Sequence, residues 1–387
     1  MTQVMRSVTL SGPDITEREL QYVNAVLGTP RLSLGPYLEA FEQRLADYVG
    51  TRYAIGVNSG TSGLHLAIQT AGISEGAEVI TSPFSFVASA NCLLYERAKP
   101  VFVDIEPTTL NVDPEQVEAA ITPKTKAILP VHVFGHPCDM GAVMAIAGRH
   151  RLTVVEDACE ALGSQWPWTQ GDVQKLKMVG TFGRVGVFAF YPNKQITTCE
   201  GGAIVTDDAR IAELCVSLRN QGRAAGSTGA RFVHERLGYN YRLSEVHAAI
   251  GLAQLERVEE ILARRTQVAR WYTERLEPID GVTCPSVDPR ARMSWFVYVI
   301  RLGHSLLRRR SRPELMDALS QRGVPSAEYF PPIHLQPLYR RQFGFREGRY
   351  PVAERVAQET LALPFHTRLT LEEVDYVCQQ LNEVLHG

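Results

Sequence analysis

The sequence predicts an α/β fold: a large domain built on a mostly parallel sheet of seven strands, followed by a smaller α+β C-terminal domain. Seven short apolar runs alternate with helical segments over the first two thirds of the 387 residues. Connections of this length provide the crossovers that parallel strands need. A long helical pattern then leads into a region with one clear strand and further helices. The chain is long enough for two domains with their own cores.

The seven expected strands are short apolar segments, and helical or turn-forming residues separate them. A glycine-rich turn follows the first strand, and Lys194 lies between the last two. The strands are Tyr53–Val57, Glu78–Thr81, Pro100–Val103, Ala127–Val131, Thr153–Glu156, Val185–Tyr191 and Gly202–Thr206.

A helical pattern over Glu245–Gln267 has apolar residues at helical spacing, including Ile250 and Leu255, and we expect one long helix that links the two domains. We therefore divide the chain into residues 1–256 and 257–387. The other expected elements are helices at Leu64–Ala71, Asp113–Ala120, Met140–His150, Arg312–Arg322 and Leu371–Val384, and a strand at Phe296–Leu302.

Composition and charge are those of an ordinary globular protein. The formal net charge is -2 with acids and bases mixed along the chain, which gives no reason to expect a nucleic-acid or membrane partner. The seven cysteines are an odd number without paired spacing, which favours a reducing compartment. The N-terminal residues lack the apolar core of a signal peptide, and no apolar run is long enough to span a membrane. We expect a cytoplasmic protein.

Asp157 and a glycine-rich turn are the first two candidates for chemistry. Asp157 ends an apolar run, and the carboxyl ends of strands are where α/β sheets bind ligands. Its carboxylate can pair with a protonated pyridine nitrogen, or it can cap a following helix. The turn Ser59-Gly60-Thr61-Ser62-Gly63 leads from a strand into a helix, so it is either a phosphate cradle or a capped tight turn.

Lys194 is the third candidate. It follows a hydrophobic strand and precedes Gly201-Gly202, in the segment FAFYPNKQITTCEGG. Partial burial at such a place lowers the pKa of a lysine and frees its amine for Schiff-base chemistry. Surface lysines greatly outnumber such cases, so the order of the three candidates along the chain matters more than any one of them.

Several motifs in order resemble the nucleotide-sugar aminotransferases of the DegT/StrS family. They are GVNSGTSGLHLAI, PFSFVASANCLLY with AKPVFVDIEP, VVEDACEALGS, FAFYPNKQITTCEGG, GYNYRLSEVHAAIGLAQL and YFPPIHLQPLY, and they span nearly the whole chain. The resemblance implies the fold type I of pyridoxal-5'-phosphate (PLP) enzymes, PLP as cofactor and pyridoxamine phosphate as its intermediate form. It also implies a homodimer whose active sites are shared across the interface.

The resemblance also implies a role for each matching residue. Lys194 holds the cofactor and moves the proton, Asp157 holds the ring nitrogen, and Phe86 stacks on the ring. Gly60, Thr61 and Ser62 bind the phosphate. Glu160 lies beside the 3-oxygen of the cofactor, Asn240 and Arg242 reach into the site of the neighbouring subunit, and His334 and Tyr329 face the substrate.

Three features depart from the family pattern. Ala189 replaces a serine that the family often places five residues before the lysine, so one phosphate contact is lost or comes from elsewhere. Glu160 stands where many members have Gln or His, which resembles the perosamine-synthase-like branch; two acids so close must share a proton. The segment Gln165–Met178 is longer than the usual turn, and we expect its two tryptophans to pack rather than to line the site.

The predicted reaction is a ping-pong transamination from L-glutamate to a nucleotide-linked keto-sugar, with a 4-keto-6-deoxy sugar favoured by the branch resemblance. A sugar dehydratase of the same fold and a non-catalytic regulatory protein remain alternatives, although Lys194 disfavours the first. His132, His136 and Cys138 have the spacing of metal ligands. We nevertheless expect no metal site, because this segment follows a strand rather than lying along a helix.

Overall fold

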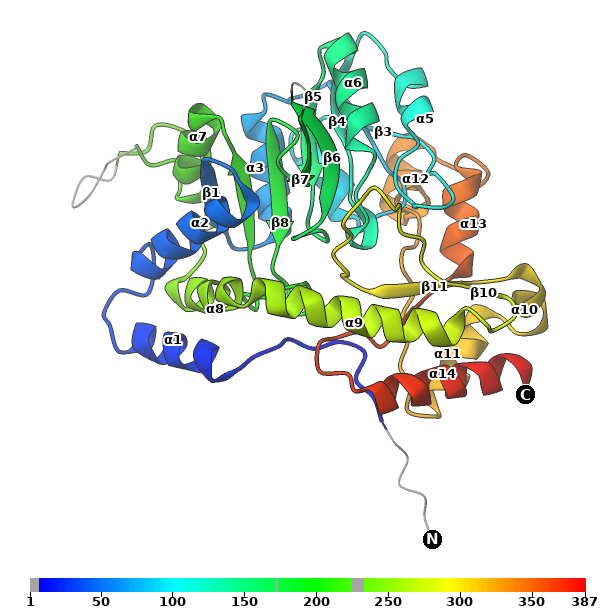
Figure 1. Cartoon of the computed structure of the whole chain (residues 1–387). Helices are drawn as coiled ribbons and strands as arrows, with labels where there is room; N and C mark the ends of the chain where they lie inside the picture. Colours follow the sequence, from blue (N-terminus) through cyan, green and yellow to red (C-terminus); the bar gives the residue numbers. More distant parts are fainter. Residues whose placement is uncertain (1–6, 171–172, 225–232) are drawn as a thin grey trace.

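The computed structural model describes residues 7–170, 173–224 and 233–387 and confirms the predicted α/β fold (Figure 1). The large sheet has seven strands in the order β1-β9-β8-β5-β4-β2-β3. Only β9 runs antiparallel to its neighbours, β1 and β8. The strands are β1 (Tyr53–Val57), β2 (Glu78–Thr81), β3 (Lys99–Phe102), β4 (Thr125–Leu129), β5 (Thr153–Asp157), β8 (Val185–Ala189) and β9 (Gly202–Thr206).

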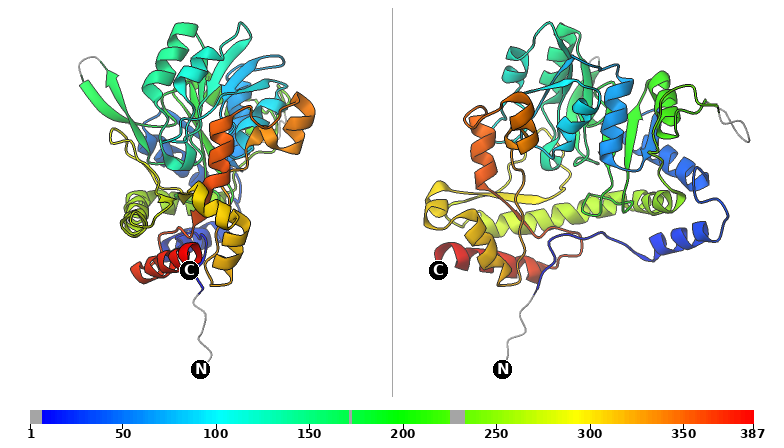
Figure 2. Two further views of the ribbon diagram at one scale, coloured as in Figure 1. Left: turned by 90° about the vertical axis from the view of Figure 1, so that its right-hand side faces the viewer. Right: turned by 180° about the vertical axis from the view of Figure 1, so that it is seen from behind.

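Helices cover both faces of this sheet (Figures 1 and 2). Alternate residues of a strand enter different cores: Ile55 and Val155 lie in one core, and Ala54 and Val154 in the other. No helix among the described residues is long and apolar enough to cross a membrane. The helices before α8 are α1 (Glu17–Leu27), α2 (Pro36–Val49), α3 (Gly60–Thr70), α4 (Ala88–Tyr95), α5 (Pro114–Ala119), α6 (Met140–His150) and α7 (Ala209–Arg219).

The prediction of one helix over Glu245–Gln267 is wrong. The chain forms α8 (Glu245–Glu256) and α9 (Val258–Leu276), with a break at Arg257. The Arg257 side chain turns toward the N-terminal segment, where it pairs with Glu19 at 3.3 Å. The predicted boundary between residues 256 and 257 coincides with this break, and it remains a proposal.

The C-terminal elements build a third core on α9 (Figure 1). A three-stranded antiparallel sheet, in the order β10-β11-β12, packs with helices α11 and α14. Val8, from near the N-terminus, also lies in this core. The elements of this core are β10 (Val282–Thr283), β11 (Tyr298–Leu302), β12 (Thr360–Leu363), α10 (His304–Arg309), α11 (Arg312–Ser320) and α14 (Leu371–His386). Helices α12 (Pro337–Phe343) and α13 (Pro351–Glu359) instead pack into the core that contains Ile55, through Tyr339 and Val356.

The segment from Gln165 to Met178 forms a two-stranded antiparallel hairpin, β6 (Gln165–Gln170) and β7 (Val173–Met178), rather than a long turn. It projects from the large domain in the left view of Figure 2. Trp166 is buried in a core of the sheet, and the Trp168 ring lies 5.5 Å from that of Phe182. Both tryptophans pack, as expected. Residues 171–172, like residues 1–6 of the N-terminal segment, lie outside the described residues.

Candidate active site

A cavity of about 430 Å³ opens where strands β1, β5 and β8 end. Residues from the glycine-rich turn, from the strand ends and from the C-terminal part of the chain line it together. The structure thus brings together seven of the predicted site residues: Gly60, Thr61, Phe86, Asp157, Glu160, Lys194 and Tyr329.

Asp157 is the last residue of β5 and is almost fully buried. Its Oδ2 accepts a hydrogen bond from Ser89 Oγ at 2.7 Å, and its Oδ1 accepts one from the backbone N–H of Cys159 at 3.1 Å. The next regular element is strand β6, so the helix-cap alternative for Asp157 is wrong. The two bonds hold a buried carboxylate in one orientation at the cavity wall, as a partner for a ring nitrogen requires.

Lys194 lies in the connection between β8 and β9. Its side chain is 13% exposed, and Nζ lies 3.4 Å from Oε1 of Glu160 and 3.8 Å from the ring centroid of Phe296. An amine between a carboxylate and an aromatic face is held in place, yet it still borders the cavity. These contacts place Lys194 as a nucleophile that a small molecule in the cavity can reach.

Glu160 is the second buried acid of the cavity. Its Oε2 accepts a hydrogen bond from the backbone N–H of Phe134 at 2.9 Å. Burial raises the pKa of Glu160, against the opposing effect of the Lys194 ammonium and of that hydrogen bond. The nearby Asp157 carboxyl acts in the same direction as burial and also raises the pKa of Glu160.

The glycine-rich turn opens helix α3 four residues earlier than predicted, because Ser59 caps it by accepting the N–H of Ser62 at 3.1 Å. The N–H groups of Gly60 and Thr61 are therefore at the first two helical positions, which have no intrahelical acceptor. A Cβ on Gly60 would lie 2.7 Å from the Cβ of Ala189, so only glycine allows this close approach. Such a helix start suits a phosphate.

Ser62 is a correction to the predicted phosphate site. Its hydroxyl donates to Asn58 Oδ1 at 2.7 Å, inside the turn, and Ser62 does not line the cavity. Ser59 lines it instead. The motif contains Ser59, Thr61 and Ser62, and the sequence alone did not show which of these hydroxyls would cap the helix.

His334 does not reach the cavity either. It is fully buried, and its Nε2 lies 2.9 Å from Oε1 of Glu354. Burial lowers the pKa of His334, against the effect of Glu354. The prediction that His334 faces the substrate site of its own chain is wrong, whereas Tyr329 does line the cavity, five residues earlier.

Asn240 and Arg242 lie outside the lining of the cavity of their own chain. Asn240 is exposed, and its backbone carbonyl accepts a hydrogen bond from Asn58 Nδ2 at 3.3 Å. Arg242 donates to Asn220 Oδ1 at 3.1 Å. Both residues thus border the glycine-rich turn from outside, and their predicted role in a neighbouring subunit remains a prediction.

Two residues that contact the predicted Asp157 and Lys194 escaped the sequence analysis. Ser89, which orients Asp157, lies in the PFSFVASAN motif one helical turn after Ser85, and the two hydroxyl oxygens are 2.7 Å apart. That spacing of hydroxyls is a signal that was available. Phe296, whose ring contacts the Lys194 amine, comes from the C-terminal part of the chain, and no local sequence pattern predicts that contact.

The metal-like histidines have partners within the protein. His132 Nε2 lies 3.2 Å from Glu156 Oε2, and His136 Nε2 accepts the N–H of Asp288 at 3.1 Å. Across the described ranges, no three His, Cys, Asp or Glu side chains are grouped as metal ligands would be.

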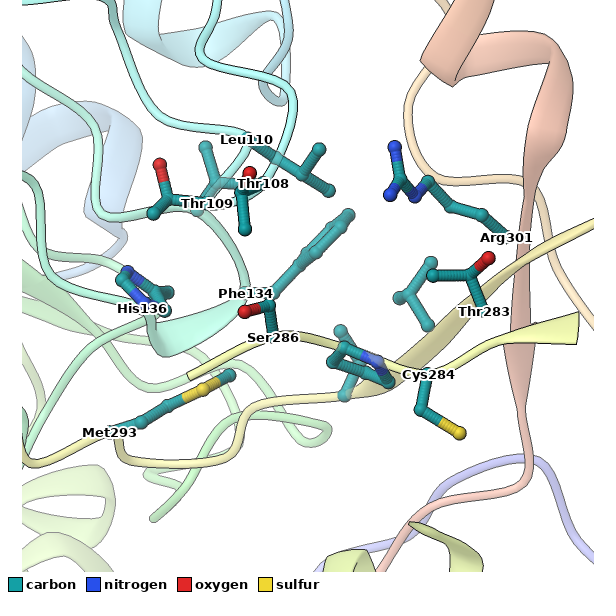
Figure 3. Close-up of a pocket in the computed structure, with 14 residues that line it drawn as sticks. Thr108, Thr109, Leu110, Phe134, His136, Thr283, Cys284, Ser286, Met293 and Arg301 are labelled. Atoms are coloured by element: carbon teal, nitrogen blue, oxygen red, sulfur yellow. The ribbon is translucent and has the colours of Figure 1, made fainter. Parts of the chain in front are cut away.

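A second, smaller cavity of about 160 Å³ is lined in part by Phe134 (Figure 3). The ring of Phe134 stacks on that of Phe330, which lines the larger cavity. The labelled side chains of His136, Cys284 and Arg301 surround it. Asp157, Glu160 and Lys194, which line the larger cavity, do not line this one.

The residues of the larger cavity fit PLP. The Asp157 carboxyl matches a pyridinium nitrogen, and the Lys194 amine matches an aldehyde. The start of helix α3 matches a phosphate. Gly60 lets the start of α3 lie against Ala189 and Cys159, where a Cβ would collide with both. Lys194 would bind the aldehyde carbon, Asp157 the ring nitrogen, and Gly60 and Thr61 the phosphate.

Comparison with known proteins agrees with this geometry. Residues 13–382 match the DegT/DnrJ/EryC1/StrS aminotransferase family. The GDP-perosamine synthase of Caulobacter vibrioides is 38% identical over 380 residues, which cover 98% of each chain. Among solved structures, the aminotransferase PseC of Helicobacter pylori, involved in pseudoaminic acid biosynthesis, has a TM-score of 0.90 at 28% identity, over 98% of this chain and 99% of that one.

The PLP form of the putative sugar aminotransferase Spr1654 from Streptococcus pneumoniae likewise has a TM-score of 0.90, at 26% identity and 98% coverage of both chains. The cofactor named in that structure is the one that this cavity fits. The protein is a PLP-dependent aminotransferase of the DegT/DnrJ/EryC1/StrS family.

Proposed function

We propose that the protein transfers an amino group from L-glutamate to a 4-keto-6-deoxy sugar carried by a nucleoside diphosphate. The observation that carries the proposal is the joint placement of Lys194, Asp157 and the start of α3 in one cavity. The similarity to a GDP-perosamine synthase over 98% of the chain supports a nucleotide sugar as the amino acceptor.

Each residue has a defined task in this reaction. PLP supplies an electron sink for the carbon that loses or gains the proton. Asp157 holds the ring nitrogen through a carboxylate that Ser89 keeps in position. Lys194 Nζ takes the proton from the substrate carbon and returns it, and Glu160 lies close enough, at 3.4 Å, to exchange a proton with that amine.

Phe86 and Tyr329 shape the entrance of the cavity. Phe86 lines it while 60% of its surface is exposed, so its ring is available to a flat cofactor or to a substrate. Burial and the nearby Glu160 raise the pKa of Tyr329, which keeps its hydroxyl protonated as a hydrogen-bond donor at neutral pH. We assign Phe86 to the cofactor ring and Tyr329 to the substrate.

We further propose a homodimer in which Asn240 and Arg242 complete the site of the partner. Asn240 is exposed beside Asn58, Arg242 is half-buried beside Asn220, and both lie outside the lining of their own cavity, which supports this assignment. Mixed dimers of Lys194→Ala and Arg242→Ala chains test it. If sites are shared, one site of each mixed dimer has both residues intact, and activity returns on mixing; two inactive variants that stay inactive in verified mixed dimers would refute the sharing.

The seven cysteines are all unpaired in the structure, which supports our expectation of a reducing compartment such as the cytoplasm.

The acceptor is tested with a panel of 4-keto-6-deoxy and 3-keto sugars carried by GDP, UDP and dTDP. The protein is first converted with L-glutamate to its amine-loaded form and freed of the donor, and each keto-sugar is then added alone. We expect amination of a 4-keto-6-deoxy sugar, seen by mass spectrometry, and none with Lys194→Ala. Amination of 3-keto sugars only would contradict the proposed acceptor while leaving the aminotransferase assignment intact.

A further inference from the structure

Arg265 of helix α9 is a buried cation without a counterion. The residue is 2% exposed, and among the described residues no carboxylate forms an ion pair with it. Removing a guanidinium from water is unfavourable, and an apolar side chain of similar length would avoid that penalty. Stability alone therefore does not explain an arginine at this place.

The Arg265 guanidinium joins two segments that meet at the active site. Its Nη2 donates to the backbone carbonyl of Lys194 at 2.7 Å, and its Nη1 donates to the carbonyl of Phe296 at 3.1 Å. Longer contacts reach the carbonyls of Asn193 and Trp295, the preceding residue in each segment. The planar fork of arginine is suited to two acceptors at fixed separation.

The two joined residues also meet through their side chains, since the Nζ of Lys194 lies 3.8 Å from the ring centroid of Phe296. The distance between the lysine and the aromatic wall of the cavity thus depends on the two carbonyls that Arg265 holds. Gln195 makes a parallel link, because its Nε2 donates to the carbonyls of Glu160 and Ser294. Two neighbouring residues of the Lys194 loop are therefore tied to the same C-terminal segment.

We propose that Arg265 is a positioning residue that holds the Lys194 amine at the angle and depth needed to attack the cofactor aldehyde. It does so through the Lys194 and Phe296 carbonyls and touches neither cofactor nor substrate. The inference rests on Lys194 as the cofactor lysine. Borohydride reduction of the PLP-loaded protein followed by peptide mass spectrometry tests that point separately, by identifying the modified lysine.

The next residue of the same helix provides a matched control. Arg264 also donates to two backbone carbonyls, those of Thr367 and Leu369, at 2.8 and 2.7 Å. These acceptors lie in a C-terminal loop that does not line the cavity. Arg264→Met therefore removes the same kind of side chain and the same number of strong bonds without affecting the Lys194 loop.

The experiment measures how fast PLP-free protein takes up PLP, followed by the visible absorption band of the lysine-bound cofactor. We expect Arg265→Met to slow uptake by about 10- to 100-fold, because the amine is misplaced by a fraction of its own length. Arg265→Lys, which keeps the charge and loses the fork, should fall between it and the wild type. Arg264→Met should take up PLP at the wild-type rate.

A second measurement separates an effect on the lysine from damage to the whole site. In a Lys194→Ala background, where PLP binds without a covalent bond, adding Arg265→Met should leave the Kd for PLP unchanged. A weaker Kd there, in proportion to the slower uptake, would overturn the proposal. So would wild-type uptake by Arg265→Met, or by Arg265→Lys if the methionine variant does not fold.

Discussion

The amine of Lys194 and the carboxyl of Glu160 lie 3.4 Å apart in a cavity where both side chains are largely shielded from water. This pair links the residue that reacts to a group that can hold a proton. Burial raises the pKa of Glu160, against the opposing effect of the Lys194 ammonium.

The raised pKa of Glu160 makes stability depend on pH. A carboxyl that holds its proton more tightly in the folded than in the unfolded state contributes stability below its ordinary pKa, and this contribution is lost as the pH rises through the folded value. Glu160→Gln should therefore match the wild type in acid and be more stable than the wild type at neutral pH. Urea unfolding of PLP-free protein between pH 4 and pH 8 measures the difference.

Glu78 is a control of opposite sign. Hydrogen bonds from Thr122 and Lys99 lower its pKa, so its contribution is present at neutral pH and lost as the pH falls through the folded value. Glu78→Gln should be less stable than the wild type at neutral pH. If the two variants show the same slope against pH, the account of Glu160 is wrong.

Lys194→Ala should abolish transamination and leave a folded protein. The substitution removes one ion pair and one contact with an aromatic ring, so we expect the free energy of unfolding to change by no more than about 2 kcal/mol. Circular dichroism and chemical unfolding establish the fold, and amino transfer from glutamate measures activity. Turnover close to that of the wild type would remove Lys194 from the mechanism.

Asp157→Asn should fold normally and react slowly. The amide can still accept the Cys159 N–H and bond the Ser89 hydroxyl, which can reverse its own role from donor to acceptor. Only the negative charge opposite the ring nitrogen is lost, and we expect single-turnover reaction with glutamate to slow by about 100- to 1,000-fold. An unchanged rate would place Asp157 away from the ring.

Gly60→Ala should destabilise the protein and weaken PLP binding together. The new Cβ would meet Ala189 at 2.7 Å and the Cys159 sulfur at 3.1 Å, an overpacking that costs about 1–3 kcal/mol. Gly148→Ala is the control, because a Cβ there meets nothing within 4 Å inside helix α6 and should stabilise by about 0.5–1 kcal/mol. Thermal unfolding and PLP titration report both; equal effects of the two substitutions would contradict the cradle.

Much of the large domain was predictable because its strands are apolar runs with clear ends. Strands β1, β2 and β9 have the predicted bounds, and helix α6 begins and ends where expected. The break at Arg257 was not predictable from periodicity, because the apolar pattern continues across it. At the break, the Arg257 side chain pairs with Glu19, a residue more than two hundred positions away.

The candidate site likewise contains residues that the local sequence pattern predicts and residues that it does not. Asp157, Gly60 and Lys194 lie at strand ends and turns, where local pattern places them near the sheet edge. Phe296 and Arg265 act through contacts with the Lys194 loop that join distant parts of the chain, and no local pattern contains that information. His334 was misplaced because a loop histidine in a motif does not reveal whether Glu354 will bury it.

The visible absorption spectrum of PLP-loaded protein, before and after L-glutamate, tests the central claim most directly. We predict a band from the lysine-bound cofactor that disappears with glutamate and returns when 2-oxoglutarate is added, and that never forms in Lys194→Ala. A band that glutamate leaves unchanged would contradict glutamate as the donor. Failure of the wild-type protein to form the band at all would contradict the assignment of this cavity, with Lys194 at its wall, as the active site.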